Sequence, residues 1–324
     1  AQVVGAHGPL PGGDIPKFAV VAYLAEAAMA QALAEDGPDV VLVWFPEPDT
    51  SFHYRELGSA DTRAVMEAVD TAFGRLLDAA TSGPRGARTA VLALSDHGQI
   101  TTAGSWDIEA ALRAAGLAAA VKPAEGDRLA LTRGAMGEVR ALDGDAALVR
   151  EAAAFLMTQD EVGMVFARND LAETLPGTLP LSAVMLDHPR APALAYVMRS
   201  DTGPDKYGLP GQGLITGGGV PVGGGMHGGL NRHELSTVLL ARAPGMEAGF
   251  ADDRPCGLPD VAPTVLGLLG IEAGGMAGEP LPLAPTASPD VETATLEARY
   301  EGFAQALTRR RIGQRWYLDH GGRL

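Results

Sequence analysis

Three short clusters of Asp and His have the residue types and spacing of a metal-binding reaction centre. The segment EPDTSFH holds Asp49 and His53 four residues apart, SDHG holds the adjacent pair Asp96 and His97, and GMHG holds His227 between glycines. Carboxylates and neutral imidazoles are ligands that suit zinc or manganese. Each cluster alone is common in ordinary loops, so it is their combination that indicates a metal-dependent function.

The first two clusters each follow an apolar segment of strand length. Residues 40–45 and 89–95 are continuous apolar runs, which are typical of strands buried on both faces of a parallel sheet. Between them, residues 61–80 carry apolar side chains at spacings of three and four, which predicts a helix. A strand, a helix and a strand in this order predict a right-handed crossover unit of an α/β sheet. Such sheets gather ligands at the carboxyl ends of their strands, where these clusters stand.

The order of the motifs resembles the alkaline phosphatase superfamily, and within it the nucleotide pyrophosphatase/type I phosphodiesterase branch. The matching segments are EPDTSFH (47–53), SDHG (95–98), GMHG (225–228) and LPDVAPTVLGLLGIEAGGMAG (258–278), and the resemblance runs from about residue 38 to 283. It implies an α/β fold, a three-layer sandwich with a central, mostly parallel sheet and a small inserted cap region. It also implies hydrolysis of phosphoric esters by in-line displacement at phosphorus between two metal ions.

The resemblance also implies how the ligands are shared between two divalent ions. Asp49, His53 and His227 would bind one ion, and Asp96 and His97 the other, with zinc favoured and manganese as the alternative. In the family the second ion is completed by an aspartate on the first strand and by a Thr or Ser nucleophile, both upstream of the region matched here. Residues 1–37 contain neither Thr nor Ser. We therefore expect the nucleophile to lie upstream of this chain and the two-metal site to be incomplete within it.

Other functions use the same ligands. A phosphonate hydrolase or a metal-dependent phosphomutase of the superfamily is one alternative, and a non-catalytic relic that binds metal or phosphate is another. Thr50 and Ser51 stand between two ligands but are interpreted as caps of the local turn. Lys206 and Tyr207, in a Gly-rich segment, are candidates to contact the substrate.

The domain organisation follows from the change of pattern along the chain. We expect residues 1–117 and 200–285 to form the metal-binding α/β core, residues 118–199 an inserted or cap region, and residues 286–324 a C-terminal helical tail. Further helices are predicted over 18–35, 145–159, 259–270 and 291–310, and further strands over 163–167, 194–198 and 235–242. Residues 201–229, in which 12 of 29 residues are Gly, are predicted to be a loop.

The composition restricts the partners. With 25 basic and 40 acidic residues among 324, the net charge of −15 argues against nucleic-acid and membrane-surface binding. The expected partner is a small phosphorylated substrate, bound through metal ions that reverse the charge locally. No apolar run reaches the ~18 residues of a membrane span. The single cysteine, Cys256, excludes internal disulfides and favours a cytoplasmic location, although one thiol also suits a periplasmic or secreted protein. A sheet without its first strand would expose an unpaired edge, which predicts a homodimer.

Overall fold

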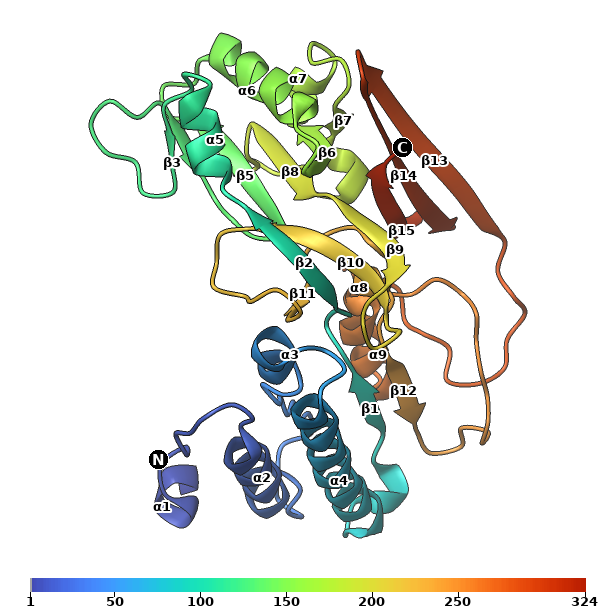
Figure 1. The fold of residues 1–324 in the computed structure, drawn as a ribbon. Coiled ribbons are helices and arrows are strands. Elements are labelled where there is room, and N and C mark those ends of the chain that lie inside the picture. Colours follow the sequence, from blue (N-terminus) through green and yellow to red (C-terminus); the bar gives the residue numbers. More distant parts are fainter. Residues whose placement is uncertain (1) are drawn as a thin grey trace. The chain divides into compact units, whose positions relative to one another are not determined.

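The computed structural model describes residues 2–324, which divide into two compact units (Figure 1). The first unit comprises the residues up to 96 together with 238–288, and the second comprises 97–237 together with 289–324. Helices and several sheets occur together, so the mixed α/β class is confirmed. None of the helices in residues 2–324 has both the length and the apolar character that a membrane span requires.

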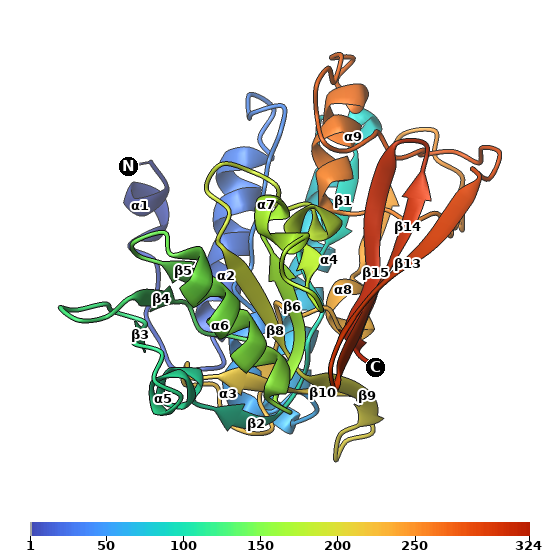
Figure 2. The ribbon, with the colours of Figure 1, turned by 90° about the horizontal axis from the view of Figure 1, so that it is seen from above.

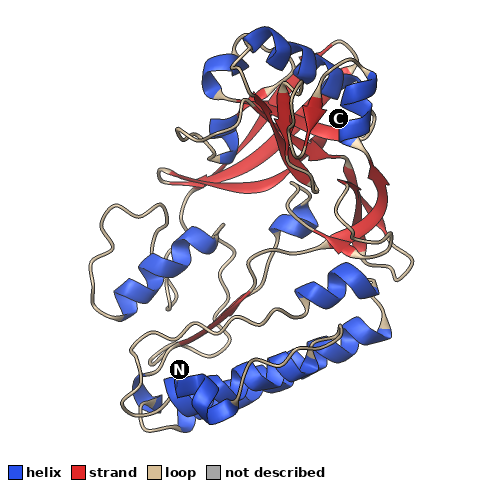
Figure 3. Cartoon of the chain, turned by 90° about the vertical axis from the view of Figure 1, so that its left-hand side faces the viewer, coloured by secondary structure: helices blue, strands red, loops and turns tan. Residues whose placement is uncertain are grey.

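The first unit is mainly helical (Figure 3). Its elements are α1 (Gln2–His7), α2 (Phe18–Ala27), α3 (Asp49–Arg55), α4 (Ala60–Ser82), β1 (Val91–Leu94), β12 (Leu239–Arg242) and α9 (Val261–Leu268). A π-helical turn, Ala28–Ala32, extends α2, which packs on α4 through Val21, Ala25, Ala72 and Leu76. The helices predicted over 18–35, 61–80 and 259–270 are thus confirmed. A strand is also present within 89–95, but its predicted burial on both faces is wrong, because Leu94 is 39% exposed and the other residues of β1 are only partly buried.

The predicted strand over residues 40–45 is wrong. This segment has no regular structure, and Val40, Leu42 and Trp44 are 53%, 85% and 67% exposed. The alternate side chains, Val43 and Phe45, pack against the core between α2 and α4. The apolar run therefore buries one face rather than two, and within the described residues it joins no sheet.

The exposed side of this segment leads to a prediction about association. Replacing Leu42 and Trp44 by serine should change the free energy of unfolding by less than ~1 kcal/mol, because both side chains are mostly in solvent. An extended apolar segment without a partner strand favours association between copies, so wild type should associate as its concentration rises and the double variant should not. Light scattering over a concentration series measures this. Val43→Ser is the control, because it should destabilise the chain without reducing association; equal masses for wild type and the double variant would contradict the prediction.

The second unit contains three sheets. Its helices are α5 (Ile108–Ala114), α6 (Ala146–Thr158), α7 (Asn169–Ala172) and α8 (Arg232–Leu235). Its strands are β2 (Ile100–Trp106), β3 (Ala119–Ala120), β4 (Leu129–Leu131), β5 (Met136–Ala141), β6 (Val162–Ala167), β7 (Leu179–Pro180), β8 (Leu194–Met198), β9 (Ser200–Pro204), β10 (Pro210–Thr216), β11 (Gly225–Met226), β13 (Val291–Tyr300), β14 (Phe303–Ile312) and β15 (Arg315–Arg323). The strand orders are β11-β2-β10-β9, β3-β4-β5-β8-β6-β7 and β13-β14-β15. The helix predicted over 145–159 and the strands over 163–167 and 194–198 are confirmed.

The six-stranded sheet is covered on both faces. Leu156 of α6 packs with Val165 and Tyr196 on one face, whereas Leu307 of β14 packs with Met164 and Phe166 on the other. Figure 2 shows β13, β14 and β15 side by side. The unit thus stacks a helix, a six-stranded sheet and a three-stranded sheet.

The predicted C-terminal helical tail, including the helix over 291–310, is wrong. β13 and β14 form an antiparallel hairpin that turns at Glu301, whose φ is 50°. Phe303, Gln305 and Leu307 alternate with less buried neighbours, which is the period of a strand. The side chain of Gln305 also accepts a hydrogen bond from the Val165 N–H at 3.0 Å, which ties β14 to β6.

The Gly-rich loop predicted over 201–229 is also wrong, since it contains most of β9 and all of β10 and β11. At Gly211, φ is +94°, and a Cβ there would lie 2.4 Å from the Ile100 side chain. The glycine therefore allows β10 to pack closely on β2. The strand predicted over 235–242 begins only at Leu239.

Strand pairing differs from the central, mostly parallel sheet that was expected. Among the described residues, parallel pairing is confined to β2–β10, β3–β4 and β6–β7. In the described part of the chain, the one strand that pairs with β1 is β12, in an antiparallel ladder that joins Leu94 to Leu239. The expected crossover unit is missing because residues 40–45, which would have been its first strand, form no ladder.

Candidate metal centre

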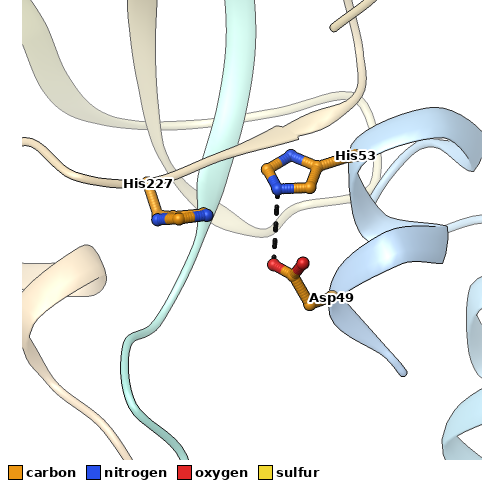
Figure 4. A group of neighbouring side chains, drawn as sticks. All are labelled: Asp49, His53 and His227. Carbon is orange, nitrogen blue, oxygen red and sulfur yellow. Dashed lines mark ion pairs between the residues drawn. The ribbon is translucent and has the colours of Figure 1, made fainter. Parts of the chain in front are cut away.

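Asp49 and His53 occupy one face of α3, four residues apart. The Nε2 atom of His53 lies 3.3 Å from Oδ1 of Asp49 (Figure 4), and the two side chains are 19% and 43% exposed. Residues at i and i+4 of a helix are neighbours on its surface, so the helix itself brings imidazole and carboxylate together. This donor set fits a zinc or manganese ion.

Glu47 holds the start of this helix. Its side chain is only 2% exposed, and its two oxygens accept hydrogen bonds from the backbone N–H groups of Lys17 and Ser51, each at 2.9 Å. Lys17 precedes α2 and Ser51 lies in the first turn of α3. A carboxylate at a helix N-terminus satisfies N–H groups without intrahelical partners and opposes the helix dipole. Glu47 therefore fixes the helix that carries Asp49 and His53.

Thr50 and Ser51 have structural roles. The hydroxyl of Thr50 donates to the carbonyl oxygen of Pro46 at 2.8 Å, and Ser51 is fully buried. The interpretation of Thr50 and Ser51 as caps of a turn is wrong, because α3 has no side-chain cap and the Thr50 hydroxyl instead bonds a carbonyl oxygen four residues back. A buried hydroxyl such as that of Ser51 is not placed to attack a substrate.

Asp96 and His97 follow the end of β1 and stand at the boundary of the two units, Asp96 closing the first and His97 opening the second. Asp96 is exposed and His97 is partly buried. The Nδ1 atom of His97 lies 3.0 Å from the carbonyl oxygen of Gly98. If Nδ1 carries the proton and donates to this oxygen, Nε2 is the nitrogen that can ligate a metal, an arrangement common among metal-binding histidines.

His227 follows β11 and stacks on His97 within the second unit. The ring centroids are 3.5 Å apart and the planes differ by 12°. Figure 4 draws His227 on the loop after β11. Two histidines separated by 130 positions in the sequence are thus in contact.

Lys206 and Tyr207 lie in the exposed turn between β9 and β10, with Lys206 Nζ 5.1 Å from the centre of the Tyr207 ring. This hairpin is bonded to the segment after His227, because the Asn231 side chain donates to the carbonyl oxygen of Asp201 at 2.9 Å. The turn that carries the two candidate substrate contacts is therefore connected to the loop of a candidate ligand.

Glu234, in α8, is a buried carboxyl group that sequence reasoning missed. Its exposure is 3%, and burial raises its pKa to about 7, while a hydrogen bond from the backbone of Gly229 opposes that rise. Glu47 was missed as well. The local sequence indicates either residue only weakly. Glu47 stands directly before Pro48, and Glu234 follows the capping residue Asn231, so both are near helix starts. The burial of each carboxyl group, however, depends on contacts distant in the sequence.

The raised pKa of Glu234 predicts a pH dependence of stability. The folded state keeps this proton up to about pH 7, whereas the unfolded chain loses it near the ordinary pKa of 4.5. Ionisation therefore destabilises the folded state as pH rises from ~4.5 to ~7, by up to ~3 kcal/mol in total. Glu234→Gln cannot ionise, so its stability relative to wild type should improve by about this amount between pH 4 and pH 8.

Urea unfolding of both proteins at several pH values, with a chelator to keep the carboxyl group away from bound cations, measures this difference. Glu138→Gln, at a partly exposed carboxylate of β5, is the control and should show no comparable gain. If the free energies of unfolding of wild type and Glu234→Gln changed with pH by the same amount, the prediction would be wrong.

Comparison with known proteins decides the family. The sequence model of the type I phosphodiesterase/nucleotide pyrophosphatase family matches residues 16–211, which include Asp49, His53, Asp96 and His97. The chain belongs to this family. The resemblance inferred from the motifs is confirmed, and His227 follows the matched range.

A solved structure shows the phosphodiesterase family's fold. Murine ectonucleotide pyrophosphatase/phosphodiesterase 5 matches with a TM-score of 0.55 at 16% sequence identity. The match covers 82% of this chain and 64% of the murine protein, so this chain spans less than two thirds of that protein's length. No curated protein sequence matches significantly. The alkaline-phosphatase-type α/β fold is thereby confirmed.

Proposed function

We propose that this chain contributes the metal-binding part of a phosphoric-ester hydrolase of the phosphodiesterase/nucleotide pyrophosphatase kind. The observation that carries the proposal is the Asp49–His53 pair, which α3 holds 3.3 Å apart inside the family-matched range. In this proposal the ligands are shared as the motif resemblance implies: Asp49, His53 and His227 would ligate one divalent ion, and Asp96 and His97 a second. Zinc is the first candidate and manganese the second.

The ions would supply Lewis-acid stabilisation of charge that develops on the phosphoryl oxygens during displacement. Two divalent ions exceed the charge of Asp49 and Asp96 by two, which explains how a chain of net charge −15 attracts a phosphate ester. Lys206 and Tyr207 would orient the ester from the β9–β10 turn. The proposal assigns no nucleophile among the residues described, since Thr50 is bonded to Pro46 and Ser51 is buried.

The test is hydrolysis of bis(p-nitrophenyl) phosphate and of p-nitrophenyl phosphate with zinc or manganese, together with binding of the metal alone by calorimetry. The expected result is metal binding and a metal-dependent activity that a chelator abolishes, greater toward the diester. His188→Ala, which removes an exposed histidine outside the motifs, is the control and should behave as wild type.

Binding of metal and of inorganic phosphate without turnover of either ester would favour the non-catalytic alternative. Hydrolysis that survives the chelator, or failure to bind either metal, would overturn the metallohydrolase assignment. A stronger reaction with the monoester would replace the diesterase preference with a monoesterase one.

A further inference from the structure

The turn α8 contacts the loop that carries His97. The backbone N–H of Gly98 donates to the carbonyl oxygen of Glu234 at 2.7 Å. A Cβ on Gly98 would lie 2.2 Å from the carbonyl oxygen of His233 and 3.0 Å from that of Ser236, so only glycine allows this approach. The residue directly after His97 is thus pressed against the backbone of α8.

The side chain of Glu234 contacts the loop that carries His227. A Cβ on Gly229 would lie 2.7 Å and 3.1 Å from the two carboxyl oxygens of Glu234, and the backbone of Gly229 is hydrogen-bonded to this carboxyl group. Gly229 is itself buried and stands two residues after His227. Within residues 2–324, Oε2 of Glu234 is buried and has no hydrogen-bond partner.

We propose that Glu234 is a positioning residue that fixes the two histidine loops against each other, its backbone holding the His97 loop and its carboxyl group holding the His227 loop. The observed stack, with ring centroids 3.5 Å apart, is the arrangement that these two contacts maintain. This inference deepens the proposed function, on which its metal-binding consequence rests. Groups that hydrogen-bond directly to metal ligands commonly change metal affinity by 10–100-fold, and Glu234 would act through the backbone of Gly98 and Gly229, next to and two residues from the histidines.

The position of α8 itself does not depend on the Glu234 side chain. Asn231 caps α8 by accepting the His233 N–H at 3.0 Å, and its amide nitrogen donates to Ser200 Oγ and the Asp201 carbonyl. Arg232 also binds Asp319 of β15 at 2.9 Å. Truncating Glu234 should therefore release the His227 loop while α8 stays in place.

The experiment compares Glu234→Ala, Glu234→Gln and Leu156→Ala in the full chain. Glutamine keeps an oxygen that can accept from Gly229, whereas alanine removes it. Leu156 is a fully buried side chain of α6 in the same unit, so Leu156→Ala is a control for loss of stability alone. The readouts are the ring-current shifts of the His97 and His227 protons by NMR, without metal, and the affinity for zinc by calorimetry, at a temperature where all variants are folded.

We expect Glu234→Ala to lose the mutual ring-current shifts and to bind zinc about 10–100-fold more weakly. Glu234→Gln and Leu156→Ala should keep both properties within about 3-fold of wild type. Retention of the shifts and of the affinity by Glu234→Ala would overturn the inference. Failure of wild type to bind zinc would overturn the proposed function but not the inference, since the ring-current shifts still report on the two loops.

Discussion

Replacing His53 by alanine should lower the affinity of the chain for its more tightly bound divalent ion by on the order of 10³-fold, equivalent to ~4 kcal/mol. The proposed first site has three protein ligands, and a zinc site normally needs three or four. Removing the His53 imidazole leaves two protein ligands, and a water molecule would have to take the third ligand's place. Asp49→Asn should also weaken binding, because it keeps the shape of the side chain but removes the charge that offsets the ion.

The same variants should remain folded. The Asp49–His53 pair is partly exposed, and such pairs contribute less than ~1 kcal/mol to stability. Loss of affinity without loss of stability therefore separates a ligand from a structural residue. Calorimetric titration with zinc, alongside urea unfolding, measures both quantities. His188→Ala should match wild type, and full affinity in His53→Ala would remove His53 from the ligand set.

Replacing Gln305 by leucine should destabilise the second unit by at least ~3 kcal/mol. Gln305 is fully buried, accepts a hydrogen bond from the Val165 N–H at 3.0 Å, and donates to the carbonyl oxygens of Val165 and Gly177 at 2.9 and 2.6 Å. Leucine has a similar volume but leaves these three backbone groups buried without partners, at ~1–3 kcal/mol each.

Gln159 offers a matched control. It is partly exposed at the end of α6, and its side chain donates to the carbonyl oxygen of Phe155 at 3.2 Å. Gln159→Leu should therefore cost less than ~1 kcal/mol, because water replaces the lost partner. Urea unfolding followed by circular dichroism compares the variants. A Gln305→Leu protein as stable as wild type would show that β14 does not need this bond to stay on β6.

Elements specified by local pattern were predictable. α4 has an apolar stripe that includes Val65, Ala72 and Leu76, and the Ser59 hydroxyl accepts from the N–H of Thr62 at its start. Stripe and cap are both visible in the sequence. α6 begins similarly at Asp145, whose carboxylate accepts from the N–H groups of Ala147 and Leu148.

The wrong predictions concern segments whose structure depends on distant partners. Residues 291–310 are rich in Ala, Leu, Glu and Arg, which favour a helix locally, yet they pair as β13 and β14 against the face of β6. Residues 40–45 have strand-like composition but no partner strand in the described part of the chain. Local propensity predicts neither the pairing of residues 291–310 nor the missing partner of residues 40–45, because both depend on residues far away in the sequence.

In the candidate site, too, some features could be predicted from local sequence and others could not. The residue types and their spacing predict Asp49, His53, Asp96, His97 and His227 as one ligand group, and the contact between Asp49 and His53 follows from their i,i+4 spacing once α3 is known. The stack of His97 on His227 could not be predicted, because it depends on how the loop after β11 is held. The same holds for Glu47 and Glu234, since nothing in a single sequence marks a carboxyl group as buried.

The exposed turn between β9 and β10 carries a side chain, Lys206, that can be labelled selectively. The chain has 3 lysines beside 22 arginines, so replacing Lys17 and Lys122 by arginine would leave the ammonium group of Lys206 as the single side-chain target for acylating reagents. A fluorophore attached there would sit on a hairpin whose backbone is bonded to Asn231, four residues beyond His227. Under the proposed function, its emission should change when a phosphate ester binds, and slower acylation of Lys206 in the presence of the ester would indicate that Lys206 contacts it.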